Sequence, residues 1–97
     1  MITKKERITL RSLAMNIKAT IWIGKEGFSE NVLKQIEQEL FNHELIKISM
    51  QETASIPNEF ELSEMAVKLG AEVVTTIGRK IVLYKKSEKK NIKHVLA

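Results

Sequence analysis

The sequence predicts an α/β domain built as a two-layer sandwich, in which a four-stranded mixed sheet carries its helices on one side. The 97 residues allow one compact core, and a hydrophobic content of 43% is enough to fill it. Segments with helical periodicity alternate with short β-branched runs in the order α-β-α-β-α-β-β. Strands separated by helices should run parallel through right-handed crossovers, and a closing hairpin adds an antiparallel strand. We therefore expect one domain over residues 1–86 and a solvated basic tail over residues 87–97.

Caps and periodicity predict the first helix and the first strand. Thr3 and Glu6 have the spacing of a capping box, and apolar residues at helical spacing follow them. We expect a helix over about residues 4–15 on this basis. Residues 19–23 are rich in β-branched and aromatic side chains and end at Gly24, which indicates a strand.

A second helix and a second strand follow. Ser29 is a good N-cap, and the helix that it begins should end at Asn42 or His43. Residues 45–50 alternate between apolar and polar side chains, which is typical of a strand with one buried face.

The last third of the chain predicts a helix and a hairpin. Asn58 and Glu61 repeat the capping-box spacing, and Gly70 suits the helix C-terminus. Residues 72–77 and 80–85 are β-rich and flank Gly78-Arg79, a pair that suits a type II′ turn. Polar side chains within the predicted strands indicate that the second face of the sheet is partly open; they are Lys47, Ser49 and Thr75.

The net charge of +4 is unevenly distributed along the chain. Residues 1–25 carry six basic residues and one Glu, a net charge of +5. Residues 26–78 carry three basic residues and ten Glu, a net charge of −7, and residues 79–97 carry seven basic residues and one Glu, a net charge of +6. Two basic ends around an acidic middle favour a polyanion as the partner.

The segment Gly24-Lys25-Glu26-Gly27, between the first strand and the second helix, is the most informative local feature. Its glycines allow close backbone approach, the following helix directs free N–H groups outward, and Lys25 adds a cation. GxxG loops clamp nucleic-acid backbone in KH domains. A tight strand-to-helix turn also uses glycines for its own conformation, and Glu26 opposes phosphate binding, so both interpretations stay open.

Other basic residues accompany this loop. Lys4, Arg7 and Arg11 lie three and four residues apart and share one helix face. A solvated helix surface has the same pattern, but Lys18 downstream and Arg79-Lys80 in the hairpin turn favour phosphate contacts.

The sequence argues against an enzyme. It contains no Asp and no Cys, and the distant His43 and His94 make neither a zinc site nor a nucleophilic relay. A paired-Glu acid–base site stays open from spacing alone. Trp22 and Tyr84 are candidates for base stacking, although a lone aromatic residue in a strand more often packs partly buried. We expect no catalytic residue, no metal and no cofactor. The absence of cysteine, of an apolar leader and of a membrane-length run predicts a cytoplasmic protein.

Four motifs in order resemble the CRM domain (chloroplast RNA splicing and ribosome maturation), whose stand-alone bacterial version is the YhbY family. They are residues 10–14 (LRSLA), 23–30 (IGKEGFSE), 43–48 (HELIKI) and 77–84 (IGRKIVLY). The resemblance spans about residues 3–86. The chain departs from the family at residues 15–19 (MNIKA), where HxLKP is frequent.

The resemblance implies a fold similar to the C-terminal domain of bacterial translation initiation factor three. It also implies a non-enzymatic RNA-binding protein that acts on precursor rRNA during assembly of the large ribosomal subunit. We expect the protein to be a monomer that binds neither a membrane nor a small-molecule substrate. The family's GxxG loop maps onto residues 24–27, and its basic first-helix positions map onto Arg7, Arg11 and Lys18. The predicted RNA-binding residues are Lys4, Arg7, Arg11, Lys18, Gly24, Lys25, Glu26, Gly27, Arg79 and Lys80. The tail lysines are expected to add phosphate contacts.

The alternative is a protein-interaction module. It would bind a ribosomal protein or a GTPase through an acidic helical surface, with the basic ends playing no part. The residues of that surface are Glu30, Glu37, Glu59 and Glu64.

Overall fold

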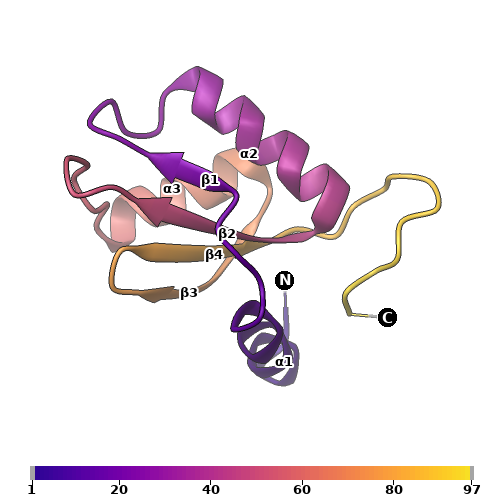
Figure 1. Cartoon of the computed structure of the whole chain (residues 1–97). Helices are drawn as coiled ribbons and strands as arrows, with labels where there is room; N and C mark the ends of the chain where they lie inside the picture. The colour runs from indigo at the N-terminus through magenta and orange to yellow at the C-terminus, as the bar shows by residue number, and fades with distance from the viewer. Residues whose placement is uncertain (1, 97) are drawn as a thin grey trace.

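The computed structural model describes residues 2–96, which form three helices and four strands. The helices are α1 (Lys4–Ala14), α2 (Glu30–His43) and α3 (Glu59–Leu69), and the strands are β1 (Ile21–Ile23), β2 (Leu45–Met50), β3 (Glu72–Ile77) and β4 (Lys80–Tyr84). The strands lie in the order β1-β2-β4-β3. β1 and β2 are parallel, whereas β4 is antiparallel to both of its neighbours. The predicted element order and mixed sheet are confirmed (Figure 1).

Local signals explain where the elements begin and end. Both predicted capping boxes are present, at Thr3 for α1 and at Asn58 for α3. The Ser29 hydroxyl accepts from the Val32 amide at the start of α2. Gly70 ends α3 with a φ of 67°, a conformation that costs glycine little. In the β3–β4 turn only Gly78 has a positive φ (58°), as a type II′ turn requires.

Side chains alternate between the two faces of the sheet and build a separate core on each. On one face, Ile23, Ile48 and Leu83 pack with Ile36 of α2 and Leu69 of α3. The helices α2 and α3 lie together on this side of the sheet (Figure 1).

The second core lies on the opposite face, which corrects the prediction that all three helices share one side. There Leu10 and Ala14 of α1 pack against Leu45, Val82 and Tyr84. These strand residues are apolar, so that half of the face needs a cover, and α1 provides it. The polar strand residues lie beyond the part that α1 protects: Lys47, Ser49 and Thr75 are only partly buried. Only part of the second face is therefore open.

The C-terminal segment also differs from the prediction, because it folds back onto the domain. Val95 and Leu96 pack against the core under α1, and the Ser87 side chain is 5% exposed. Figure 1 shows this segment leaving the sheet at the end where β4 finishes and turning back toward α1. Residues 87–96 are thus part of the folded domain.

None of the helices within residues 2–96 combines the length and the apolar character needed to cross a membrane.

Candidate nucleic-acid interface

Three loops meet at one end of the sheet, and the GxxG loop is one of them. The Gly27 amide donates to the Gly24 carbonyl (3.0 Å), which closes the turn. Gly27 has a φ of 67°, whereas the glycine at position 24 is needed for space, because a Cβ there would lie 3.1 Å from Gln51 Oε1. The amides of Lys25 and Glu26 donate to no acceptor within residues 2–96. The loop therefore presents two free N–H donors beside the exposed Lys25 side chain.

The other two loops are fastened together by Arg79. Its Nε donates to the Met50 carbonyl (3.2 Å), and its Nη2 donates to the carbonyls of Gln51 (2.5 Å) and Ala54 (2.7 Å). The Gln51 amide in turn donates to the Ile23 carbonyl at the end of β1 (2.8 Å). The hairpin turn, the β2–α3 loop and the start of the GxxG loop are therefore held in fixed relation, and the Arg79 guanidinium serves that structure.

Arg7 has a similar structural role on α1. Its Nη1 donates to the carbonyls of Val73 (2.7 Å) and Val74 (2.9 Å). The register between β3 and β4 shifts at this position, and a bulge leaves backbone groups without a ladder partner. The guanidinium satisfies those carbonyls and attaches α1 to the edge strand, so it is less available to a phosphate than the sequence suggests.

The remaining basic residues of the predicted site are free. All are exposed, and none forms a hydrogen bond or an ion pair with another of residues 2–96. They are Lys4, Arg11, Lys18, Lys25 and Lys80. On the other side of the sheet, α2 and α3 together carry six Glu and two Lys. The acidic helices α2 and α3 therefore lie on one face of the sheet, and the basic helix α1 lies on the other.

The tail lysines lie far from the GxxG loop. The tail is anchored at Glu44, which precedes β2, whereas the GxxG loop lies beside the opposite end of β2. The Lys89 ammonium of the tail donates to Asn42 Oδ1 (2.8 Å), and that of Lys85, just before the tail, donates to the Leu69 carbonyl (2.9 Å). The C-terminal segment does lie beside the N-terminal residues, because Ile2, Val95 and Leu96 pack on the same core and Val95 lines a depression together with Lys18.

Glu44 holds the tail through its carboxylate, a role that was not predicted from the sequence. The side chain is fully buried and accepts from the amides of Ser87 (2.7 Å) and Val95 (2.9 Å) and from His94 Nδ1 (2.6 Å). Burial by itself would raise the pKa of the Glu44 carboxyl, but these three hydrogen bonds outweigh it and hold the pKa below its ordinary value. The signal that could have revealed it is an acidic residue placed between a helix end and an apolar strand.

Tyr84 and Trp22 have opposite environments. Tyr84 is buried against α1; burial, followed by the charges of Glu44 and Glu6, raises the pKa of its phenol. Trp22 is 59% exposed on the open part of the sheet. Partial burial was expected for both; Tyr84 is buried, whereas Trp22 is mostly exposed, because no helix within residues 2–96 covers β1 on that face.

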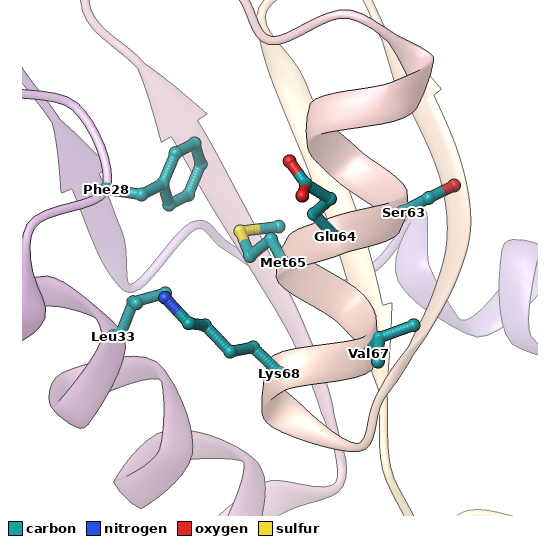
Figure 2. Close-up of a pocket in the computed structure, with 7 residues that line it drawn as sticks. All are labelled: Phe28, Leu33, Ser63, Glu64, Met65, Val67 and Lys68. Atoms are coloured by element: carbon teal, nitrogen blue, oxygen red, sulfur yellow. The ribbon is translucent and has the colours of Figure 1, made fainter.

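An apolar groove lies between α2 and α3. Phe28, Leu33 and Met65 line it, with Glu64 and Lys68 at its rim (Figure 2). Within residues 2–96 no group of three or more His, Cys, Asp or Glu side chains could hold a metal ion.

Comparison with known proteins agrees with the motif order. Residues 2–85 match the CRS1/YhbY (CRM) domain. The chain belongs to this family. It is 38% identical over 89 residues to a Bacillus subtilis protein named "Probable RNA-binding protein YqeI", covering 91% of this chain and 92% of that one. It is 34% identical to a Methanocaldococcus jannaschii protein named "Probable RNA-binding protein MJ0652", covering 90% of this chain and 66% of that one.

A solved structure has the same CRM fold. It is the solution structure of SAV1595 from Staphylococcus aureus, described as a candidate RNA-binding protein. It superimposes with a TM-score of 0.70 at 38% identity and covers 97% of this chain and 99% of that one.

Proposed function

We propose that this CRM protein binds RNA without catalysing a reaction, and that it acts as a monomeric, cytoplasmic assembly factor on precursor rRNA of the large ribosomal subunit. One observation carries the RNA-binding part: five exposed cations of the predicted site have no partner within residues 2–96, while six of the twelve Glu lie on α2 and α3, on the other face of the sheet. The names of the relatives support the same activity.

The mechanism is clamping of the RNA backbone. The free amides of Lys25 and Glu26 suit phosphate oxygens, and the Lys25 ammonium adds charge at the same position. Arg11, Lys18 and Lys80 extend the contact beyond the loop. Arg79 contributes by holding the loops in place rather than by meeting a phosphate.

Salt dependence tests this mechanism. Arg11→Ala and Lys25→Ala should each weaken binding of a structured rRNA fragment and lower the slope of log K against log salt by about 0.7–0.9. Lys68→Ala on α3 removes the same charge from the acidic side and is the matched control. If the three variants show the same affinity and slope as the wild type, the basic surface is not the RNA site.

The ribosomal assignment has its own test. Crosslinking the protein to RNA in cells and sequencing the attached fragments should enrich precursor sequences of large-subunit rRNA. Enrichment of unrelated transcripts would leave RNA binding intact and refute the assembly role.

A second candidate function is docking of a protein on the acidic side. Val67 is 82% exposed beside the groove of Figure 2, and the surrounding glutamates would suit a basic partner. Retention of protein partners after ribonuclease treatment, and their loss on Val67→Glu, would support it.

A further inference from the structure

One row of side chains crosses the whole sheet on the face opposite α2 and α3. The strand register pairs Trp22 with Ser49, Ser49 with Lys80, and Lys80 with Ile77. Paired residues point to the same side of a sheet, so these four side chains lie next to one another. Strands are about 4.8 Å apart, so the row is roughly 14 Å long.

This row is apolar and accessible at both ends. Trp22 is 59% exposed and Ile77 is 68% exposed. Neither residue contributes to the core under α1, and no helix within residues 2–96 covers them. A large aromatic side chain that is exposed on a strand leaves apolar surface in contact with water, which is typical of a binding surface.

Two basic residues lie beside the row. A shallow depression beside it is lined by Arg11 and Met15 of α1 and by Lys47, Thr75 and Ile77 of the sheet. Together with the row itself, these residues form what we call the open sheet face. It contains three cations, Arg11, Lys47 and Lys80, which form no ion pair within residues 2–96, and it contains no carboxylate.

The occupant that fits this chemistry is an unpaired segment of RNA. Bases in a duplex are hidden in the stack, whereas unpaired bases stack on exposed aromatic rings and leave their phosphates to nearby cations. Aromatic residues on a four-stranded sheet bind two or three bases in this way in RRM domains. The charge of the face excludes a basic peptide, and the indole suits a planar base.

We propose that the open sheet face binds a short unpaired RNA segment, with one base stacked on Trp22 and the neighbouring phosphates on Lys80, Lys47 and Arg11. This proposal rests on the proposed RNA-binding function and specifies which part of the RNA the sheet binds. Trp22 lies two residues before Gly24, so a bound RNA strand can pass directly from the GxxG loop onto the sheet.

The chain contains a single tryptophan, so its fluorescence reports on this site alone. A single-stranded RNA of eight nucleotides should quench the emission saturably, and a blunt duplex of the same sequence should not. With labelled RNA, Trp22→Leu should weaken single-strand binding about fivefold to one hundredfold, and Trp22→Phe should restore most of it. Phe60→Leu, at a 69% exposed aromatic residue on α3, is the control, and circular dichroism verifies folding.

The outcomes separate the two proposals. Equal affinity of Trp22→Leu and wild type, or equal quenching by the duplex, overturns the stacking proposal while RNA binding stands. If the wild type binds neither RNA, the proposed function fails as well. If Trp22→Leu instead loses a ribonuclease-resistant protein partner at unchanged RNA affinity, the open sheet face binds protein and the proposal is wrong.

Discussion

The carboxylate of Glu44 should couple the C-terminal segment to the rest of the domain, and Glu44→Gln isolates this effect. The substitution keeps the size of the side chain and the unusual backbone at this residue (φ 64°). It removes the charge and replaces one oxygen by an amide NH2. At Oε2 that donor would face the Ser87 amide, and at Oε1 it would face the Val95 amide. At least one hydrogen bond to a buried charge is lost in either orientation.

A hydrogen bond to a charged group contributes about 1.5–3 kcal/mol, so we expect the free energy of unfolding to fall by about this amount. In a domain of this size, Tm changes by about 4–8 °C per kcal/mol, which gives a decrease of about 6–24 °C. The loss has an upper limit, because the segment can undock and expose its amides to water. The cost cannot exceed the free energy with which residues 87–96 dock.

A double-mutant cycle measures the coupling. Urea unfolding followed by circular dichroism compares Glu44→Gln in the full chain and in a chain that ends at residue 86. We expect a cost of about 1.5–3 kcal/mol in the full chain and little in the shortened one. Glu64→Gln, at an exposed position on α3 away from the C-terminal segment, is the control and should change neither. An equal cost of Glu44→Gln in both chains would refute the anchoring role of the carboxylate.

Other outcomes follow from the same contacts. Acid should act through Glu44: its pKa is lower in the folded than in the unfolded chain, so its stabilisation is complete above about pH 4.3 and is lost as the pH falls through the folded value. Tm should therefore fall with pH there in the wild type and less in Glu44→Gln. The pKa of Tyr84, the single tyrosine, is raised in the folded chain. The stabilisation by its neutral phenol is therefore present below about pH 10 and is lost as the pH rises through the folded value. Tyrosinate absorbance should show titration above pH 10, and a midpoint at or below pH 10 would contradict burial of the phenol. Arg79→Ala should lower the free energy of unfolding by about 1–2 kcal/mol, because three partly exposed carbonyls lose their donor. The neighbouring Lys80→Ala should lower RNA affinity at unchanged Tm. Identical Tm values for the two variants would contradict the structural role of Arg79. Arg7→Lys should lower Tm by about 4–8 °C, since one ammonium replaces the guanidinium that meets two carbonyls, and Arg11→Lys should not.

The boundaries of the elements were predictable because their causes are local. A capping residue and its partner lie three positions apart, so Thr3 with Glu6 and Asn58 with Glu61 could be recognised without the fold. The glycines that end α3 and turn the β3–β4 hairpin act through their own backbone angles. The GxxG loop is likewise contained in four consecutive residues, and its location between β1 and α2 is as expected.

The roles of the arginines could not be predicted in the same way. Arg7 and Arg79 have the same side chain as Arg11, and nothing in their neighbourhood along the chain marks them as structural. Their acceptors lie 66 and 67 residues away for Arg7 and 25–29 residues away for Arg79. Only a folded backbone with unpaired carbonyls at those positions distinguishes an arginine that holds the fold from one that is free for a phosphate.

The order of helices and strands, the helix caps and the GxxG loop are thus properties of short stretches of sequence, and they were sufficient for the family and the fold class. The side of the sheet on which α1 packs depends on contacts across the whole chain, and so do the docking of residues 87–96 on Glu44 and the exposure of Trp22. The sequence of a strand shows which side chains point to the same face, but packing of the whole chain determines which element covers each face. That choice leaves Trp22, Lys47 and Lys80 open to a ligand and moves the tail lysines to the far end of the sheet.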